Sequence, residues 1–422
     1  DPTESRGLGD VYKRQYKAYR TEGEILLITA LLRSLGKHFT IDGLTMLLEG
    51  HGRQSISEEV DVSRTVGWFT SLYPVNFGIQ DESVLATLLR VKEQIKRVPG
   101  KGFAFGVLES VTNDQLSINP PVTFNYLGEV DALDNSQHFF QLSGEPHGNS
   151  ISPNWERSNL FDVTVMVVNG KLNAQVAAGG VNLKEEELQS ITSSFQEELK
   201  ALIETLRQEQ NEFLTPSDLT LTELDQEAVT ELNENHNLED VYGLSPLQEG
   251  MYYHWKMAPD SDVYLNQIAY NRHQTLSTEK VEKAFTKLIE RHSVLRTGFT
   301  TDYLGKVLQV VRKQVPVDFN YIDNRNGTKS REEYLSEDVS RSFDIDAESL
   351  VRLTLVQFSE QDYLFVWAFH HVILDGWCIR ILINDFDQYL AGELNGEHVQ
   401  LPEVRPFSNY IDWLGQQNKS KS

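Results

Sequence analysis

Cysteine is nearly absent from this sequence, since Cys378 is the only one among 422 residues. A single cysteine excludes a disulfide framework and any cysteine-rich metal site, and it is typical of the reducing cytoplasm, where we expect this protein. The sequence also lacks an apolar run of the ~18 residues that a membrane-spanning helix needs. Its N-terminus has no basic segment followed by an apolar one, as a secretory signal would have. We therefore expect no membrane partner.

Basic residues are scarce relative to acidic ones. Lysine and arginine number 38, whereas aspartate and glutamate number 62, which gives a formal net charge of −24. So much negative charge would repel a phosphate backbone or an anionic lipid surface. It therefore argues against nucleic acid and against an anionic membrane as partners. Apolar residues still make up 40% of the chain, enough for ordinary globular cores, so wholesale disorder is excluded. At ~150 residues per domain, the length indicates two or three domains.

The first half of the chain alternates between helical and strand-like patterns. Residues 1–15 show neither periodicity nor a capping signal, and we expect them to be an artefactual or disordered leader. A helix is predicted from Glu22, with Gly36 in the C′ position that ends it. The patterns further predict strands over 44–48, 122–127, 161–169 and 171–178, a hairpin turn at Asn169-Gly170, and an amphipathic helix over 184–207.

An acidic stretch separates the two halves. Residues 209–240 gather glutamate and aspartate with hardly any basic residue, which indicates a solvated linker with one short helix. Beyond it, the apolar spacing predicts a helix face over 281–289 and a hairpin with strands over 353–358 and 363–369. Strands mixed with helices in each half predict the α+β class, with the helices on one face of each sheet.

The strongest signal for chemistry follows the second hairpin strand, where His370 and His371 precede Asp375 and Gly376. A histidine at a strand end can project its imidazole, whose ordinary pKa lies near neutral pH, into a cleft as a proton acceptor or hydrogen-bond partner. Asp375 can brace the loop without touching a substrate. The residues alone also fit a histidine pair satisfied in the core and an ordinary Asp-Gly turn. No cluster of cysteine, histidine or carboxylate shows the spacing of zinc ligands, so we expect no metal.

The segment 370–376 resembles the HHxxxDG signature of the condensation domains of nonribosomal peptide synthetases. This family is built from two chloramphenicol-acetyltransferase-like lobes. Two upstream segments resemble the family's first and second motifs in the expected order, namely 244–251 (LSPLQEGM) and 291–299 (RHSVLRTGF). Three ordered motifs make coincidence improbable, and they favour a functional role for the histidine loop.

The resemblance assigns a role to each residue of this loop. It implies that His371 positions the α-amino group of the acceptor, or takes its proton, as the amine attacks a carrier-bound thioester. It implies that Asp375 is structural, with Arg296 as its buried ion-pair partner. His370 and Trp377 would shape the loop and the substrate tunnel.

Four segments of the first half resemble, in order, the motifs of epimerization domains, which are relatives of condensation domains. Epimerising an α-carbon needs a base on one face and an acid on the other, because the proton leaves and returns on opposite sides. The resemblance implies that Glu49 shares this work with a histidine of an HHxxxDG motif in a preceding lobe. Without the other motifs, Glu49 would fit a surface carboxylate beside a glycine-rich loop. The segments are 49–53 (EGHGR, with Glu49, His51 and Arg53), 64–75, 99–106 and 124–128 (FNYLG, with Asn125 and Tyr126).

Together the resemblances imply the C-terminal lobe of an epimerization domain over 16–208, an acidic linker over 209–240, and the N-terminal lobe of a condensation domain over 241–422. We expect both lobes to be α/β sandwiches. We expect the fragment to be inactive alone, because the active-site tunnel of this family lies between two lobes. The domain order implies condensation of a D-configured donor with an L-configured acceptor.

The resemblance also implies how substrates arrive. No cofactor would bind directly, because the substrates are carried on the phosphopantetheine of partner carrier domains. The expected partners are the upstream and downstream peptidyl carrier domains and the adjoining adenylation domains. Two other functions stay open, namely a non-catalytic module that docks carrier domains and a free-standing acyltransferase in which His371 uses an acyl-CoA-type thioester.

Overall fold

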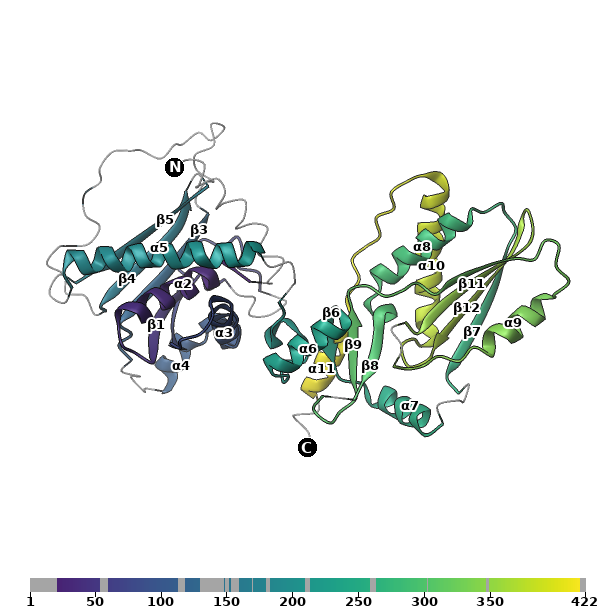
Figure 1. The fold of residues 1–422 in the computed structure, drawn as a ribbon, viewed down its shortest axis with the longest axis horizontal. Coiled ribbons are helices and arrows are strands. Elements are labelled where there is room, and N and C mark those ends of the chain that lie inside the picture. The colour runs from purple at the N-terminus through teal and green to yellow at the C-terminus, as the bar shows by residue number, and fades with distance from the viewer. Residues whose placement is uncertain are drawn as a thin grey trace. The chain divides into compact units, whose positions relative to one another are not determined.

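The computed structural model describes residues 21–53, 60–112, 118–129, 148, 152, 159–168, 170–179, 183–208, 213–258, 263–301, 303–346 and 349–417. The chain divides into two compact units, Asp1–Phe213 and Leu214–Ser422 (Figure 1). Each unit mixes helices with β-sheet, so the predicted α+β class is confirmed. The predicted leader over 1–15 lies outside the described residues. Within the described part, no helix is long and apolar enough to cross a bilayer.

The sheet of the first unit contains β1 (Gly43–Gly50), β2 (Ser71–Gly78), β3 (Val122–Glu129), β4 (Phe161–Val168) and β5 (Lys171–Ala178). Its strand order is β2-β1-β3-β4-β5. The pairs β1/β3 and β3/β4 are parallel, whereas β1/β2 and β4/β5 are antiparallel. The four strands that the sequence patterns predict are thereby confirmed. Asn169 of the predicted turn lies outside the described residues, and Gly170 has the positive φ of +69° that such a turn favours.

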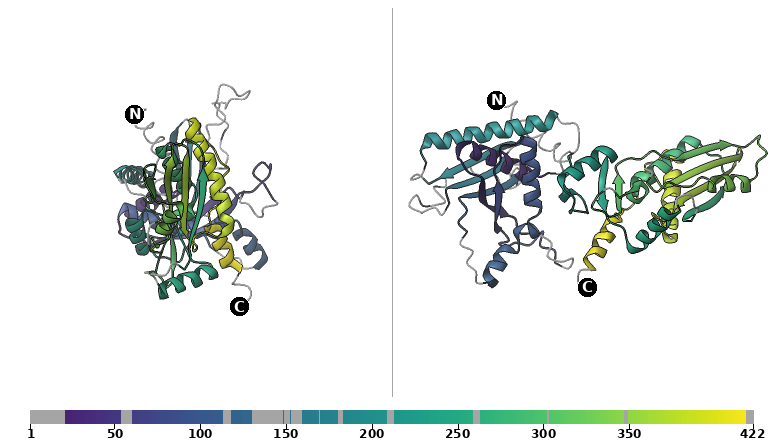
Figure 2. Two further views of the ribbon diagram at one scale, coloured as in Figure 1. Left: turned by 90° about the vertical axis from the view of Figure 1, so that its right-hand side faces the viewer. Right: turned by 60° about the horizontal axis from the view of Figure 1, so that its bottom comes forward.

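The helices α2 (Gly23–His38) and α5 (Glu185–Gln208) lie side by side against this sheet (Figures 1 and 2). Their apolar faces bury Leu27, Ile28 and Leu202 completely, as an amphipathic helix on a sheet requires. The other helices of this unit that the structure describes are α3 (Val84–Lys96), the 3-10 turn η1 (Pro99–Gly102) and α4 (Phe105–Thr112).

Gly36 does not end α2, so that prediction was wrong. The helix continues to His38, where Phe39 adopts an extended conformation and its N–H bonds the carbonyl of Leu35. A Cβ on Gly36 would lie 2.8 Å from Cγ2 of Ile79, closer than side chains approach each other. Glycine is therefore required here by the close packing of α2 against Ile79, and not by a left-handed C′ conformation.

The acidic stretch expected to be a solvated linker is folded from residue 213 onward. It contains η3 (Pro216–Asp218), α6 (Gln226–His236) and the beginning of β6 (Leu238–Tyr242). Its acidic residues give the exposed side its charge, while its leucines and valines turn inward. These apolar residues, which are Leu214, Leu219, Leu224, Val229, Leu232 and Leu238, form a buried cluster with Leu308 and Val310.

The second unit contains two sheets among its described residues. One has the order β10-β11-β12-β7, and the other has the order β6-β9-β8. The hairpin expected over 353–358 and 363–369 is confirmed as β11 and β12. The strands are β7 (Leu265–Arg272), β8 (Thr297–Thr300), β9 (Leu308–Arg312), β10 (Phe319–Asp323), β11 (Val351–Ser359) and β12 (Asp362–His370).

Helices cover both faces of the four-stranded sheet, whereas we expected them on one face. The helices α8 (Thr278–Arg291) and α10 (Gly376–Asn395) pack on one face through Phe285, Trp367 and Phe386. The helix α9 (Arg331–Val339) packs on the other through Tyr334 and Val366. This double cover explains why β11 and β12 are buried at consecutive residues instead of alternate ones. The remaining described helices are η4 (Ser293–Arg296), α7 (Pro246–Met257) and α11 (Ser408–Gln417).

Candidate functional site

The histidine loop joins the end of β12 to the start of α10. β12 pairs with β11 on one side and β7 on the other, so its last residue, His370, is fixed within the sheet. α10 begins at Gly376, immediately after its N-cap, Asp375. The loop between them is therefore short and anchored at both ends, and His371 is its first residue.

His371 is half-buried, and its orientation is determined by two hydrogen bonds. Its backbone N–H donates to the carbonyl of Tyr264 at 2.7 Å, and its ring Nδ1 lies 2.7 Å from the carbonyl oxygen of Leu374. Because a carbonyl oxygen can only accept, Nδ1 carries the hydrogen of the neutral imidazole. Nε2 then keeps its lone pair, which can accept a proton or a hydrogen bond.

Two residues that hold this loop were missed by the reasoning from sequence. Tyr264 has a φ of +93°, a conformation that costs a non-glycine residue ~1–3 kcal/mol and is concentrated at functional sites. Gln248 donates from Nε2 to the carbonyl of Val372 at 2.8 Å. Gln248 does lie in the segment 244–251, but nothing in the sequence marks a tyrosine with positive φ.

His370 points into the protein and has a structural role. It is 5% exposed, and its Nδ1 accepts a hydrogen bond from the backbone N–H of Val372 at 3.2 Å. Burial, with a smaller contribution from His371, lowers the pKa of His370 to about 4. His370 is therefore neutral near pH 7, and it fixes the backbone that follows it.

Asp375 caps α10 and is exposed to solvent. Its Oδ1 accepts hydrogen bonds from the backbone N–H groups of Trp377 and Cys378, both at 3.0 Å. The hydrogen bonds from Cys378 and Trp377 stabilise the carboxylate and lower the pKa of Asp375. This is the usual arrangement of an aspartate N-cap, so the structural role expected of Asp375 has a different physical basis from the one we predicted.

The predicted ion pair between Asp375 and Arg296 was wrong. Arg296 is 5% exposed and pairs with Glu239 of β6, with 2.6 Å between Nη1 and Oε2. Its guanidinium also donates to the backbone carbonyls of Ile289 and Arg312. The motif that contains Arg296 therefore ties η4 to β6 and β9, and it does not contact the cap of α10.

Two residues follow the loop at the start of α10, namely Trp377 and Cys378. Burial raises the pKa of Cys378 above its ordinary value, which disfavours the thiolate that a nucleophile needs. Trp377 is 87% exposed at the start of α10. Over the described residues, no group of three histidine, cysteine or carboxylate side chains could hold a metal ion.

In the first unit, the structure brings Glu49 and Asn125 together. Glu49 lies near the end of β1, and Asn125 lies on the neighbouring parallel strand β3. Nδ2 of Asn125 donates to Oε2 of Glu49 at 2.7 Å, so the amide fixes the direction of a half-buried carboxylate. Tyr126, next on β3, is partly buried against the core of this unit.

Arg53, four residues after Glu49, contacts residues 62–69. Nη1 of Arg53 donates to the carbonyls of Val62 and Thr65, both at 2.7 Å, and its guanidinium lies 4.4 Å from the ring centroid of Phe69. The first two epimerization-type segments are thus in direct contact. Within the same loop, the exposed His51 accepts at Nδ1 from the backbone N–H of Arg53.

The glycine-rich segment 99–106 packs against the same motifs. A Cβ on Gly102, whose φ is +77°, would lie 2.0 Å from the ring of Tyr73, so only glycine fits there. Burial, with help from Glu24 and Glu22, raises the pKa of Tyr73 to about 12. Burial and the charge of Glu22 raise the pKa of Glu24 to about 7, a perturbed carboxyl that the sequence did not reveal.

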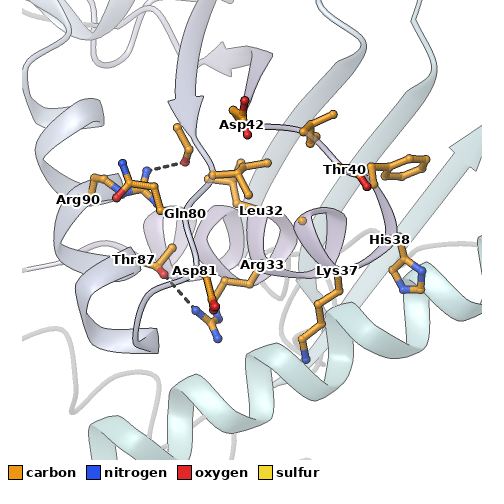
Figure 3. Close-up of a pocket in the computed structure, with 15 residues that line it drawn as sticks. Leu32, Arg33, Lys37, His38, Thr40, Asp42, Gln80, Asp81, Thr87 and Arg90 are labelled. Carbon is orange, nitrogen blue, oxygen red and sulfur yellow. Dashed lines mark hydrogen bonds between the residues drawn. The ribbon is translucent and has the colours of Figure 1, made fainter.

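A cavity of about 470 Å³ opens beside the C-terminal end of α2 (Figure 3). Arginine side chains that line the cavity bind other parts of this unit. Arg33 binds Glu198 and Thr87, and Arg90 binds Glu82 and the carbonyl of Gly78. None of the predicted site residues lines this cavity, so we do not assign a substrate to it.

One family model matches most of the chain. The family model of the Condensation domain matches residues 6–224 and 238–422. The chain therefore belongs to the condensation domain family of nonribosomal peptide synthetases. The resemblance to the condensation domain family is confirmed at this level.

Among curated proteins, the chain is similar to one of the proteins that make up linear gramicidin synthase in Brevibacillus parabrevis, at 35% identity over 419 residues. It is also similar to bacitracin synthase 1 of Bacillus licheniformis, at 29% identity over 421 residues. The matches cover 96% and 97% of this chain but only 8% of either relative. The chain thus spans a small part of the length of these relatives.

Among solved structures, the epimerization domain from the third module of tyrocidine synthetase B matches at 31% identity with a TM-score of 0.45. That match covers 48% of this chain and 46% of the domain. The first condensation domain of the calcium-dependent antibiotic synthetase matches at 15% identity with a TM-score of 0.40, over 43% of this chain and 44% of that one.

Proposed function

We propose that the second unit supplies the proton-handling histidine of a condensation domain, which joins a carrier-bound donor to the amine of a carrier-bound acceptor. The observation that carries this proposal is the hydrogen bond from Nδ1 of His371 to the carbonyl of Leu374. It leaves Nε2 as the basic nitrogen of a ring whose position is fixed by the end of a buried strand. The domain order favours a D-configured donor and an L-configured acceptor.

The chemistry requires one proton acceptor at the amine. The acceptor nitrogen attacks the carbonyl carbon of the donor thioester, and a C–N bond forms. The C–S bond then breaks, and the phosphopantetheine sulfur leaves as a thiolate, which finally takes up the proton that the nitrogen has lost. Nε2 of His371 either receives the proton that the nitrogen loses or holds the neutral amine in the attacking direction. Such positioned acid–base groups typically contribute ~10²–10⁴-fold to the rate.

For the first unit, we propose the C-terminal lobe of an epimerization domain, in which Glu49 exchanges the α-proton on one face of the substrate. Support comes from the bond between Asn125 and Glu49, which would aim the carboxylate, and from the four ordered motifs. The opposite face would be served by a histidine of the other lobe.

The partners follow from this chemistry. Substrates would arrive on the phosphopantetheine arms of upstream and downstream peptidyl carrier domains, and the amino acids would be loaded by adjoining adenylation domains. We further propose that this chain alone is inactive, because each tunnel would need its second lobe.

Single-turnover assays in the intact synthetase test both assignments. With carriers loaded to equal extent, His371→Ala should slow peptide formation by ~100-fold or more. Glu49→Gln should slow exchange of the α-proton and leave condensation intact when the donor carrier is loaded directly with the D-configured residue. His273, which is 74% exposed on its side chain, provides the control His273→Ala. Peptide formation that is unaffected by His371→Ala would instead support a module that only docks carrier domains. Transfer from soluble acyl-CoA would support the acyltransferase alternative.

A further inference from the structure

Two side-chain amides are buried beside the histidine loop, although the proposed reaction does not use them. Gln248 of α7 is 5% exposed, and Gln309 of β9 is fully buried. Burying an amide is costly unless its donors and acceptors are paired. Two buried amides in contact must therefore have hydrogen-bond partners, and those partners indicate what the pair does.

The two amides pair with each other and with the backbone of three residues in two segments, 243–245 and the histidine loop. Nε2 of Gln248 donates to the carbonyl of Val372 at 2.8 Å and to Oε1 of Gln309 at 3.1 Å. Nε2 of Gln309 donates to the carbonyl of Gly243 at 2.9 Å and to Oε1 of Gln248 at 3.3 Å. Oε1 of Gln248 also accepts from the backbone N–H of Ser245 at 3.0 Å.

These contacts define the orientation of the Gln248 amide. Its Nε2 faces the carbonyl of Val372, which only accepts, and its Oε1 faces the N–H of Ser245, which only donates. Exchanging oxygen and nitrogen would break both bonds. The donor that reaches the histidine loop is therefore fixed.

Val372 follows His371 directly. Its carbonyl belongs to the peptide bond between Val372 and Ile373, which lies in the chain between His371 and Leu374. The N–H of Val372 is held by Nδ1 of His370 at 3.2 Å. With its carbonyl held by Gln248, both polar groups of this residue are fixed. The carbonyl of Leu374 is then kept where Nδ1–H of His371 can reach it.

We propose that Gln248, supported by Gln309, is a positioning residue that keeps His371 in the tautomer with a free Nε2. This inference rests on the proposed function of His371. It assigns a second purpose to the 244–251 segment, whose Ser245 and Gln248 also form the capping box of α7. Without the donated bond, the loop gains alternative conformations, and Nδ1 loses its constant partner.

The test combines spectroscopy and kinetics on Gln248→Leu. In the 422-residue chain labelled with ¹⁵N-histidine, long-range ¹H–¹⁵N correlation should show the Nδ1–H tautomer for His371, with the signal assigned by its loss in His371→Ala. In Gln248→Leu, the ratio of this tautomer to the Nε2–H form should fall by about fivefold or more, as expected when one neutral hydrogen bond is lost. In the intact synthetase, kcat should fall by about 10–100-fold with KM nearly unchanged.

A matched control and a second variant keep the test decisive. Glu249→Leu introduces the same side chain at the next position of α7, which is exposed, so its tautomer ratio and kcat should remain at wild-type values. If near-UV circular dichroism shows that Gln248→Leu does not fold, Gln248→Met takes its place, because its unbranched side chain is similar in shape and removes the donors without burying a charge.

Either a wild-type tautomer ratio or a wild-type kcat in a folded Gln248 variant would overturn the positioning role. The two levels of the proposal remain distinguishable. A synthetase that still forms peptide with His371→Ala would reject the proposed function. A synthetase that needs His371 but tolerates Gln248→Leu would reject the positioning role alone.

Discussion

Replacing Asp375 by alanine should weaken the second unit slightly and leave its fold intact. The residue is an exposed N-cap whose Oδ1 accepts from the backbone N–H groups of Trp377 and Cys378. Loss of an aspartate cap typically costs ~0.5–2 kcal/mol, and its negative charge at a helix N-terminus contributes ~0.3–1 kcal/mol. Both contributions come from the same carboxylate and are not fully additive, so we expect Asp375→Ala to cost ~1–2 kcal/mol.

The pH dependence of this effect follows from the lowered pKa of Asp375. A carboxyl whose folded pKa lies below its ordinary value of 3.8 stabilises the protein fully above that value. The stabilisation is lost as the pH falls through the folded pKa. Asp375→Asn, which keeps an acceptor but no charge, should therefore differ from wild type at about pH 6 and match it in acid.

A double-mutant cycle with Arg296 gives the sharpest assay. Arg296→Met removes the guanidinium that donates to the carbonyls of Ile289 and Arg312 and pairs with Glu239, and it should cost ~3 kcal/mol or more. Urea unfolding of both single variants and the double variant should give a coupling energy below ~0.5 kcal/mol, since the two residues share no partner. A coupling above ~1 kcal/mol, or a cost of ~3 kcal/mol for Asp375→Ala alone, would refute this account of the loop.

Three further predictions concern other positions. Because His370 has a folded pKa of about 4 and an ordinary value of 6.5, wild type should lose about 2–3 kcal/mol as the pH falls from 6.5 to 4, and His370→Asn should abolish this loss in urea unfolding. Gly52→Ala should destabilise the first unit by ~2–4 kcal/mol in thermal unfolding, because φ is +62° and a Cβ would lie 1.5 Å from the carbonyl oxygen of Phe69. Asn125→Ala should slow α-proton exchange by ~10-fold or more in the intact synthetase, because Glu49 loses the donor that orients it.

Each of these three has its own contrary result, and Gly52→Ala also has a matched control. Gly106, inside α4, has open space around its Cβ position, so Gly106→Ala should leave stability unchanged or raise it. A Gly52→Ala variant as stable as Gly106→Ala contradicts the steric argument. An identical pH profile for wild type and His370→Asn contradicts the assignment of that titration. A wild-type rate of α-proton exchange in Asn125→Ala would mean that Glu49 does not need the hydrogen bond from Asn125.

The sequence predicted those elements whose pattern lies within the element itself and its immediate flanks. The hairpin of β11 and β12 was found because its two apolar runs are bounded by polar residues at Ser359 and Asp362. Likewise α5 was found because one helix face carries its leucines. In such elements the local pattern and the tertiary environment agree.

The failures share one cause, which is a contact between segments far apart in the chain. Gly36 signals a helix end by itself, yet it is glycine because Ile79 approaches it. The acidic residues of 209–240 predicted a solvated linker, but the leucines of the same segment pack against β9. The family resemblance implied Asp375 as the partner of Arg296, whereas Arg296 pairs with Glu239 on β6. The same limit kept Gln248 and Tyr264 out of the predicted site.

The central claim is that Nε2 of His371 handles the proton of the acceptor amine. Its most direct test is the rate of peptide formation in the intact synthetase with His371→Ala and Asp375→Ala compared at equal carrier loading. We predict that His371→Ala lowers the single-turnover rate by ~100-fold or more, whereas Asp375→Ala, which only loses a helix cap, lowers it far less. A rate for His371→Ala within about threefold of wild type, measured on folded and fully loaded protein, would contradict the claim.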